Sequence, residues 1–465
     1  MQLCGNDVVE GSEDCDGANC CACTEDEVNP NQCVLANTVG GEFEETAKLV
    51  AKDGALSDSF GTNVSISGDA MIVGSVNDDD KGSASGSAYV YTRLNEGWGG
   101  EQKLLASDGV SGDWFGGYVS IDGSTLVVGA YSDDDNGKAA GSAYVFTQSD
   151  GVWTEQQKLL ASDGAANDWL GRPVSISGDT VVAGAYGNDD NGSVSGSAYV
   201  FVRKNGVWSE EKKLLASDGA ASDQFGASVG ISGDTIVVGA NSDDDKGDKS
   251  GSAYVYVRSN GNWTEQQKLV PGDGEAKDYF GHSVAIDGDT LAVGAIENDE
   301  AEYNAGAVYV YVRDNDEWAL QQKLTASDAG LGDEFGFSVS LSGDRLVTGT
   351  YASQNAGAAY VFERANGVWT EKKKLSGKDT VKGDRFGYSV SIRGAAIAVG
   401  AKDDDDKGSA SGGAYVFEGG RPNCLTVDTC DCKPGFVGPT CADTECGDGI
   451  TAGDEGCDDG NVDNH

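Results

Sequence analysis

Short runs that alternate apolar and polar residues, separated by Gly-rich turns, recur along this chain. The segment that follows Asp218 holds four such runs: Ser228–Ile231, Thr235–Gly239, Ser252–Arg258 and Glu265–Val270. In the third run valines alternate with tyrosines, which is the period-two pattern of a strand. Ser232-Gly233-Asp234 and Asn260-Gly261 are short turns of the kind that join antiparallel strands. The pattern therefore predicts four antiparallel strands in the segment and no helix.

The same segment occurs seven times, and each copy carries a Phe-Gly step, once replaced by Leu-Gly. The spacing of these steps is 55 residues five times and then 51, and they begin at Phe60, Phe115, Leu170, Phe225, Phe280, Phe335 and Phe386. A fixed period of this size indicates a stack of supersecondary units. Seven copies of four strands predict an all-β fold, a seven-bladed β-propeller of four-stranded antiparallel blades.

The two ends of the repeated block predict how this ring closes. The last copy supplies only three strands, Ser389–Ile392, Ala395–Val399 and Gly413–Glu418. An additional strand, Thr46–Ala51, precedes the first Phe-Gly step, with Phe43 where later copies have tryptophan. We therefore expect the N-terminal strand to complete the last blade and to remove the exposed sheet edges.

The repeated aromatic residues are interpreted as packing groups, because each blade needs a large apolar side chain at a fixed point of its contact with the next blade. His282, the one histidine of the repeated block, follows a Phe-Gly step, and we expect it to pack at the start of a strand. The repeated tryptophans are Trp98, Trp153, Trp208, Trp263, Trp318 and Trp369.

Acidic residues concentrate in two loops of each copy. One loop precedes the Phe-Gly step and the other joins the second and third strands, so both are expected on one face of the ring. The candidate residues in the first loop include Asp53, Asp58, Asp108, Asp113, Asp163, Asp168, Asp218 and Asp223. Those in the second are Asp78, Asp79, Asp80, Asp133, Asp134, Asp135, Asp189, Asp190, Asp243, Asp244, Asp245, Asp403, Asp404 and Asp405.

Carboxylate-rich loops with Gly at their bends suit Ca²⁺, which takes six to eight oxygen ligands. Clustered carboxylates also repel one another, so a compensating cation is expected. We therefore predict Ca²⁺ or a similar divalent ion on this face. The alternative is a ring of solvated turns, since Asp and Gly are common turn residues. The sixth copy lacks the second acidic loop and reads Tyr351-Ala352-Ser353-Gln354-Asn355 instead.

The cysteines lie only outside the repeated block, in two clusters of six. Even-numbered clusters of this kind predict disulfide-rich modules and an extracellular or cell-surface location. Zinc is a weaker alternative, because paired C-x2-C spacing and nearby histidines are missing. Sequons at Asn63, Asn191 and Asn262 are compatible with glycosylation. The candidate disulfide cysteines are Cys4, Cys15, Cys20, Cys21, Cys23, Cys33, Cys424, Cys430, Cys432, Cys441, Cys446 and Cys457.

The charge balance argues against several classes of partner. The formal net charge is −45, with 77 Asp and Glu against 32 Lys and Arg. Nucleic acids and anionic membranes are therefore not expected as partners, since phosphate contacts need clustered basic residues. No apolar run approaches the roughly 18 residues that a membrane helix needs. Met1 begins no recognisable signal peptide, so we expect a secreted protein's leader, and any anchor, to lie outside this sequence.

With its seven Phe-Gly and Gly-Ala steps, the chain resembles the FG-GAP repeat proteins, which include the propeller of integrin α subunits. The resemblance implies a secreted or cell-surface propeller that recognises other molecules through the face bearing the loops. The integrin calcium loop D-x-D-x-D-G is missing, because the corresponding hairpin here is only Ser177-Gly178-Asp179 or its equivalent. The family's calcium ligands therefore do not carry over.

The flanks also resemble known modules. The run from Cys430 to Cys441 is similar to the second half of an EGF-like module, and Cys446 to Asn461 is similar to the start of a cysteine-rich surface repeat. We expect a cysteine-rich module at 1–41, the propeller at 42–420, a partial EGF-like module at 421–442 and a truncated cysteine-rich repeat at 443–465.

These features favour an extracellular recognition or adhesion propeller that binds a protein or glycan partner, with calcium dependence through the acidic loops. An extracellular polysaccharide-active enzyme and a rigid structural spacer are the alternatives. Carboxylate pairs are capable of acid–base catalysis. Catalysis usually needs an asymmetric site, however, and we expect the blades to differ mainly by loss of loops, with no unique polar group of residues at any strand end.

Overall fold

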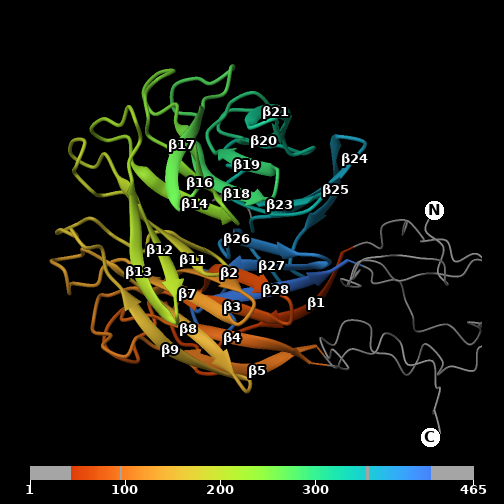
Figure 1. The fold of residues 1–465 in the computed structure, drawn as a ribbon. Helices are drawn as coiled ribbons and strands as arrows, with labels where there is room; N and C mark the ends of the chain where they lie inside the picture. The colour runs from red at the N-terminus through yellow and green to blue at the C-terminus, as the bar shows by residue number, and fades with distance from the viewer. Residues whose placement is uncertain (1–42, 95–96, 352–355, 420–465) are drawn as a thin grey trace, which may run out of the picture. The chain divides into compact units, whose positions relative to one another are not determined.

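The computed structural model describes residues 43–94, 97–351 and 356–419 (Figure 1). Within these ranges the chain forms 28 β-strands and no helix. The strands assemble into seven four-stranded antiparallel sheets, each a blade of one propeller. The predicted fold class is confirmed. All twelve predicted disulfide cysteines, and with them the cysteine-rich and EGF-like flanks, lie outside the described residues.

The blades follow one another along the chain, and in six of them the four strands are consecutive. The strands of these blades are β2(Phe60–Ser67), β3(Ala70–Ser75), β4(Ser87–Leu94), β5(Gly97–Leu104); β6(Phe115–Asp122), β7(Thr125–Ala130), β8(Ser142–Ser149), β9(Val152–Leu159); β10(Val174–Ser177), β11(Thr180–Ala185), β12(Ser197–Lys204), β13(Val207–Leu214); β14(Phe225–Ser232), β15(Thr235–Ala240), β16(Ser252–Ser259), β17(Asn262–Leu269); β18(Phe280–Asp287), β19(Thr290–Ala295), β20(Ala307–Asp314), β21(Glu317–Leu324); and β22(Ser338–Ser342), β23(Arg345–Gly349), β24(Ala359–Ala365), β25(Val368–Leu375).

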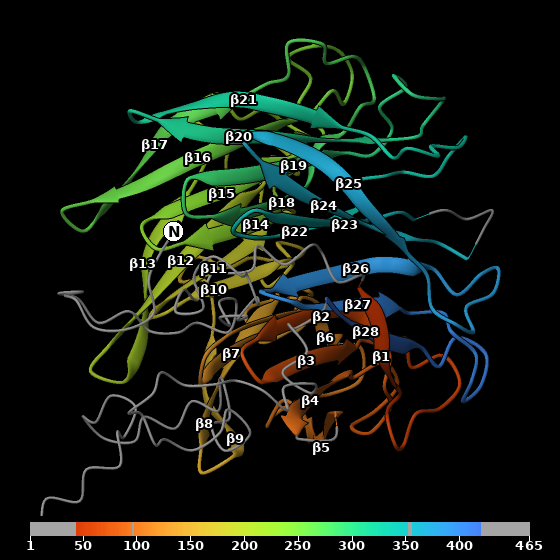
Figure 2. The ribbon, with the colours of Figure 1, turned by 90° about the vertical axis from the view of Figure 1, so that its right-hand side faces the viewer.

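The seventh blade joins the two ends of the repeated block. It consists of β26(Phe386–Arg393), β27(Ala396–Ala401), β28(Gly413–Glu418) and, as its outer strand, β1(Glu44–Leu49). Figures 1 and 2 show β1, in red, beside the blue strand β28. The N-terminal strand therefore completes the last blade, as predicted, and covers the outer edge of β28.

The strands extend beyond the predicted runs. β14 begins at Phe225 rather than at Ser228, because Phe225 pairs with Ala240 before the register shifts at a bulge that ends at Ser228. β17 begins at Asn262 rather than at Glu265, because Trp263 pairs with Arg258 across the hairpin. Phe225 and Trp263, two of the aromatic residues used as repeat markers, thus belong to the strands themselves.

The Phe-Gly step is the point where neighbouring blades meet. Gly86 of the first blade forms a parallel bridge with Phe115 of the second, and the Phe115 amide donates to the Ser85 carbonyl at 3.0 Å. Gly116 has a φ of +89°, and a Cβ at that position would lie 2.0 Å from the Ser87 carbonyl oxygen. Only glycine fits there, which explains the recurrence of the pair.

Aromatic side chains fill the contacts between blades. Phe115 is completely buried and packs edge-on against Tyr144 of its own blade, with ring centroids 5.4 Å apart. Trp208 is 2 % exposed, and its indole N–H donates to Gln156 of the preceding blade at 2.9 Å. The packing role predicted for the repeated aromatic residues is confirmed at these positions.

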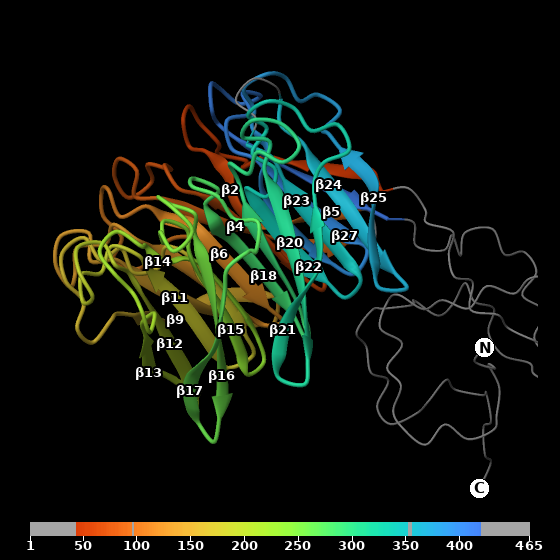
Figure 3. The same ribbon diagram turned by 90° about the horizontal axis from the view of Figure 1, so that it is seen from above.

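The two ends of the blades differ in their connections. The loops that lead from the fourth strand of one blade to the first strand of the next lie at one end, together with the loops between second and third strands. This end is here called the loop face. The tight hairpins between third and fourth strands, such as β16–β17 and β20–β21, lie at the opposite end (Figure 3). The predicted position of both acidic loops on one face is confirmed. No helix of the described residues is long and apolar enough to cross a membrane.

Candidate functional site

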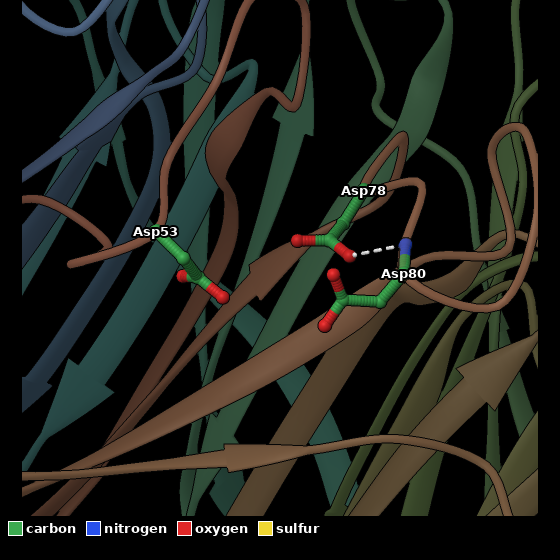
Figure 4. Close-up of side chains that lie close together, drawn as sticks. All are labelled: Asp53, Asp78 and Asp80. Atoms are coloured by element: carbon green, nitrogen blue, oxygen red, sulfur yellow. Dashed lines mark hydrogen bonds between the residues drawn. The ribbon is translucent and has the colours of Figure 1, made fainter.

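Each acidic loop pair surrounds the ammonium group of a lysine from the fourth strand. In the first blade, Lys103 on β5 lies 2.8 Å from Asp53, 2.8 Å from Asp78 and 2.6 Å from Asp80. The Tyr89 hydroxyl lies 2.9 Å from Asp53 and 3.0 Å from Asp78, so its one proton is shared between these two carboxylates. Figure 4 shows the three carboxylates turned toward one another. We call this group of one lysine, one tyrosine and their carboxylates the lysine cluster.

The lysine cluster recurs around the ring with small changes. In the third and fifth blades the position of Asp78 is taken by Asn188 and Asn298, so these clusters have one carboxylate fewer. In the seventh blade the lysine is Lys48 from β1, so the cluster also ties the N-terminal strand to its blade. The remaining contacts are Lys158 with Asp108, Asp133 and Asp135; Lys213 with Asp163 and Asp190; Lys268 with Asp218, Asp243 and Asp245; Lys323 with Asp273 and Glu300; Lys374 with Asp328; and Lys48 with Asp379, Asp404 and Asp406.

The second aspartate of each first-loop pair has a different role. Asp58 accepts a hydrogen bond from the Ala55 amide at 2.7 Å and closes its own loop. It is buried, and this burial raises its pKa. Asp79 of the second loop likewise accepts from the Ala84 amide at 2.7 Å. The residues equivalent to Asp58 with the same bond are Asp113, Asp168, Asp223, Asp278, Asp333 and Asp384.

The charges of a lysine cluster stabilise one another. Burial alone would lower the pKa of Lys103, but its hydrogen bonds to Asp53, Asp78 and Asp80 outweigh burial and raise it. Burial likewise would raise the pKa of Asp53, while the bonds from Lys103 and Tyr89 lower it. Asp78 is only 5 % exposed and Lys103 18 %. The ammonium therefore stays protonated at the centre of the cluster.

This donor set does not fit Ca²⁺ while the lysine is in place. Ligand oxygens of Asp53, Asp78 and Asp80 lie within 4.8 Å of one another, which is close enough for one ion. The Lys103 ammonium, however, lies within 2.8 Å of all three carboxylates, and Ca²⁺ needs six to eight oxygens at about 2.3–2.6 Å. The compensating cation that the sequence analysis expected is thus supplied by the chain itself, and calcium binding at these loops stays a prediction.

A second group of residues lies on the loop face, at the inner ends of the blades. The residues beside the Phe-Gly steps and after the second strands differ from blade to blade. In the second blade, Trp114 and Tyr131 lie with ring centroids 5.1 Å apart, and in the third, Trp169 and Tyr186 lie 5.0 Å apart. Arg172 lies between the two tyrosines, 5.1 Å from the Tyr131 ring and 5.0 Å from the Tyr186 ring. We call this row of four rings and one guanidinium the arginine stack.

The fifth, sixth and seventh blades contribute a second row of aromatic rings. His282 packs on Phe337 at 5.0 Å, and Phe337 stacks on Tyr351 at 4.8 Å and contacts Tyr388 at 5.1 Å. Arg385 lies over the Tyr351 ring at 4.9 Å. The packing role predicted for His282 agrees with this position. The two rows together are called the central cluster.

The two rows lie close enough for their groups to interact electrostatically. The pKa of Tyr388 is raised, first by burial and then by the nearby hydroxyls of Tyr118 and Tyr351. Arg172 of the arginine stack also acts on Tyr388, in the opposite direction. The side chains of the central cluster are half-buried, so each keeps part of its surface in contact with solvent.

Ionisable groups at the central cluster have perturbed pKa values. Burial lowers the pKa of His282 to about 4. Burial, aided by the charge of Glu297, raises the pKa of Glu334 to about 6. Lys402 lies over the Tyr388 ring at 4.7 Å, and Arg385 forms an ion pair with Asp403 at 3.0 Å. Basic, acidic and aromatic groups are therefore concentrated at one place.

The expectation that no strand end carries a unique group of polar residues is wrong. The inner ends of β6, β18 and β26, and the turn before β10, carry different side chains, and several of these contact a residue of the neighbouring blade, as Arg172 contacts Tyr131 and Phe337 contacts Tyr388. The sequence contained a signal: the residue directly after each Phe-Gly step varies while the step itself repeats. In chain order it is Thr62, Gly117, Arg172, Ala227, His282, Phe337 and Tyr388.

The predicted glycosylation sites differ in accessibility. Asn191 and Asn262 are exposed, whereas Asn63 is half-buried and its amide oxygen accepts the Val119 N–H at 3.0 Å. Asn63 thus has a structural role between the first two blades.

Comparison with known families agrees with this architecture. A family model described as FG-GAP repeat matches seven segments, which are residues 43–91, 98–146, 153–201, 208–256, 263–311, 318–362 and 369–417. Each segment contains the fourth strand of one blade and the first three of the next, as ring closure by β1 requires. No curated protein matches the chain. The likeness to integrin α subunits and to EGF-like modules stays a prediction. Because the matched segments make up well over half of the sequence, the chain belongs to the FG-GAP repeat proteins.

Proposed function

We propose that this propeller is an extracellular or cell-surface recognition module that binds a protein or glycan partner through the centre of its loop face. The observation that carries this proposal is the central cluster. In a ring whose other positions repeat from blade to blade, the positions around the axis differ and hold aromatic and charged side chains.

The chemistry of the central cluster suits recognition. Aromatic side chains and arginine are the residues that most often dominate binding energy, since they offer large contact area with little loss of conformational freedom. Here Trp114, Trp169, Tyr131 and Tyr186 are half-buried. They are held by packing, so little ordering would be needed on binding.

The lysine clusters support this function from the surrounding ring. They fix the acidic loops through charge-assisted hydrogen bonds, for example between Lys158 and Asp108 at 2.9 Å. Fixed loops provide a rigid rim around the central cluster. The extracellular location rests on the cysteine-rich sequences at both ends of the chain.

The test is binding by the full chain to an array of extracellular proteins and of neutral, basic and acidic oligosaccharides. The matched variants are Trp114→Ala with Trp169→Ala at the central cluster, and Val152→Ala with Val207→Ala at hairpin tips of the opposite face. We expect a partner whose binding is lost in the tryptophan variant and kept in the valine variant. Equal binding by both variants, or loss only in the valine variant, would contradict the proposed surface.

One observation favours a polysaccharide-active enzyme as a second function. Glu334 has a pKa raised to about 6 and lies near Glu297, and a protonated and an ionised carboxyl group are the pair that glycoside hydrolysis uses. Release of reducing sugar from a polysaccharide panel by the full chain, abolished by Glu334→Gln, would establish this activity. Binding without turnover would leave recognition as the function.

A further inference from the structure

Arg172 has different partners from the other buried or half-buried arginines among the described residues. Those others each lie within ion-pair distance of a carboxylate: Arg93 with Asp69, Arg203 with Asp179, Arg258 with Asp234, Arg313 with Asp289, Arg345 with Glu363, Arg364 with Asp344 and Arg385 with Asp403. Within the described ranges, Arg172 has no such carboxylate. Its neighbours are the rings of Tyr131 and Tyr186 and the hydroxyl of Tyr118.

Among the described residues, the guanidinium of Arg172 is therefore a charge without a carboxylate counterion. The rings of Tyr131 and Tyr186 each lie about 5 Å from the central carbon of the guanidinium. Burial alone would lower its pKa, but the hydroxyls of Tyr118, Tyr186 and Tyr131 outweigh burial and raise it, so the charge persists. The edge of a guanidinium carries N–H donors in a fork that matches the two oxygens of a carboxylate.

From this arrangement we infer that Arg172 binds the carboxylate of an acidic glycan, one built from uronic-acid sugars, at the arginine stack. The inference rests on the proposed function and specifies its ligand. A bidentate arginine–carboxylate contact would supply the missing counterion. Trp114 and Trp169 at the two ends of the stack would receive the apolar C–H faces of the sugar rings.

A uronic acid fits this site better than other anions do. The C–H face of its sugar ring can lie on the indoles of Trp114 and Trp169, whereas the carboxylate of a flexible amino-acid side chain brings no such face. Each of its sugars carries one carboxylate, so the group that meets Arg172 has a single negative charge, whereas a phosphate monoester carries nearly two at neutral pH. The difference matters because the whole chain has a formal net charge of −45.

The net charge predicts that the affinity for an acidic glycan depends on salt in an unusual way. The surrounding carboxylates repel an acidic glycan over long distances, and 0.1 M salt screens charges farther apart than about 10 Å. The contact between Arg172 and a carboxylate is partly buried and is screened less. Affinity is therefore expected to rise between about 0.01 and 0.1 M salt, the opposite of simple attraction to a basic surface.

The experiment is calorimetric titration of the full chain with an oligogalacturonate and with the same oligomer after reduction of its carboxyl groups. The variants are Arg172→Gln, Arg172→Lys, and Arg203→Gln as the matched control, because Arg203 also covers an aromatic ring but already has Asp179. We expect Arg172→Gln to weaken binding of the acidic oligomer by about tenfold to a hundredfold. Arg172→Lys should lose less, and Arg203→Gln should bind as the original chain does.

Several outcomes separate this inference from the proposed function. Equal affinity of the original chain for the acidic and reduced oligomers would overturn the role of Arg172 and leave a glycan-binding face. A partner on the array together with no binding of either oligomer would overturn the inference alone. No partner of any class would overturn both. If Arg172→Gln does not fold, the salt dependence of the original chain and the Arg172→Lys titration still decide the matter.

Discussion

At the residue scale, the distinction between structural and functional positions follows from the direction in which a side chain projects. Phe115 and Trp208 project into the contact between blades and are buried. Tyr131 and Arg172 lie at the loop face, contact each other and stay half-buried. Positions of the first kind repeat because every contact between blades has the same geometry. Positions of the second kind are free to vary, and this freedom permits a specific site in a symmetric ring.

Gly116 offers a test of the contact between blades. We predict that Gly116→Ala destabilises the chain by more than about 3 kcal/mol, because a positive φ costs about 1 kcal/mol and the Cβ would meet the Ser87 carbonyl at 2.0 Å. Gly151→Ala is the matched control: its φ is +78°, but no atom lies within 4 Å of the added Cβ. Chemical denaturation measures both. Similar losses for the two variants would show that the backbone contact does not require glycine.

His282 predicts how stability depends on pH. Its pKa is about 4 in the folded chain and 6.5 is its ordinary value, so between these values the unfolded chain binds more protons. The stabilisation is complete above pH 6.5 and is lost as the pH falls toward 4. Between pH 7 and pH 4.5, the free energy of unfolding of the original chain should fall by roughly 2 kcal/mol more than that of His282→Phe.

Glu334 provides the control for that measurement, because its dependence has the opposite sign. Its pKa is raised to about 6, so the folded chain binds the proton more tightly than the unfolded chain does. Above pH 6, burial of the ionised Glu334 carboxylate lowers the free energy of unfolding. This loss disappears as the pH falls and the carboxylate is protonated. Glu334→Gln should therefore steepen the loss of stability on acidification, whereas His282→Phe should flatten it. The same change in both variants would contradict these assignments.

At the scale of the element, the lysine cluster couples a fourth strand to two loops. Lys103 pairs with Tyr89 across β4 and β5, and both side chains reach the carboxylates of Asp53 and Asp78. A loop that would otherwise carry three repelling charges is thereby fixed to the sheet. The energy depends on the partly buried pair of Lys103 with Asp78, since exposed pairs contribute little.

We predict that Lys103→Met destabilises the chain by about 2–3 kcal/mol, because Asp78 would keep its burial and lose its counterion. Lys374→Met is the matched control, since Lys374 is 46 % exposed and its one carboxylate partner among the described residues is Asp328. We expect a loss below about 1 kcal/mol there. Denaturant unfolding compares the two. An equal loss would mean that the lysines act through their aliphatic stems rather than through charge.

The same variant tests the prediction of calcium binding. The measurement is the Tm after chelation, as calcium is added back to millimolar concentration. In the original chain the ammonium groups are expected to exclude calcium, so that Tm does not rise to a plateau. In Lys103→Met the three carboxylates have no counterion, and calcium bound to the folded chain should raise its Tm. A saturating rise in the original chain would show that calcium displaces the lysine or binds elsewhere.

At the scale of the whole molecule, the sequence was sufficient to predict the ring of blades but not the arrangement of side chains at its centre. The spacing of Phe60, Phe115 and their equivalents predicts the blades because each repeat is a local strand pattern. The contact of Lys103 with Asp53 and Asp78 depends on the register between strands and on the path of two loops. The arginine stack depends on residues of two blades meeting near the axis. Neither follows from local pattern, although the variable positions near Arg172 marked the place.

The ring has a single point of closure, and this makes its integrity testable. β1 contributes the outer strand of the seventh blade, and Lys48 binds Asp379 and Asp404 at 2.9 Å each. Removal of residues 1–50 would leave β28 with unpaired backbone groups and Asp404 with a buried, uncompensated charge. We expect this truncation to lower Tm and to produce oligomers in which exposed strands pair. The control is removal of residues 1–42, which keeps β1.

Light scattering with thermal unfolding compares the two truncations. A monomer with the original Tm is expected when only residues 1–42 are removed, since β1 and Lys48 remain. If removal of residues 1–50 also gave a monomer of unchanged Tm, the closing strand would contribute nothing to the ring. The other six blades would then hold the seventh through the Phe-Gly contacts alone, such as the bridge between Gly357 and Phe386. The stability of the propeller would in that case reside in its neighbour contacts rather than in its closure.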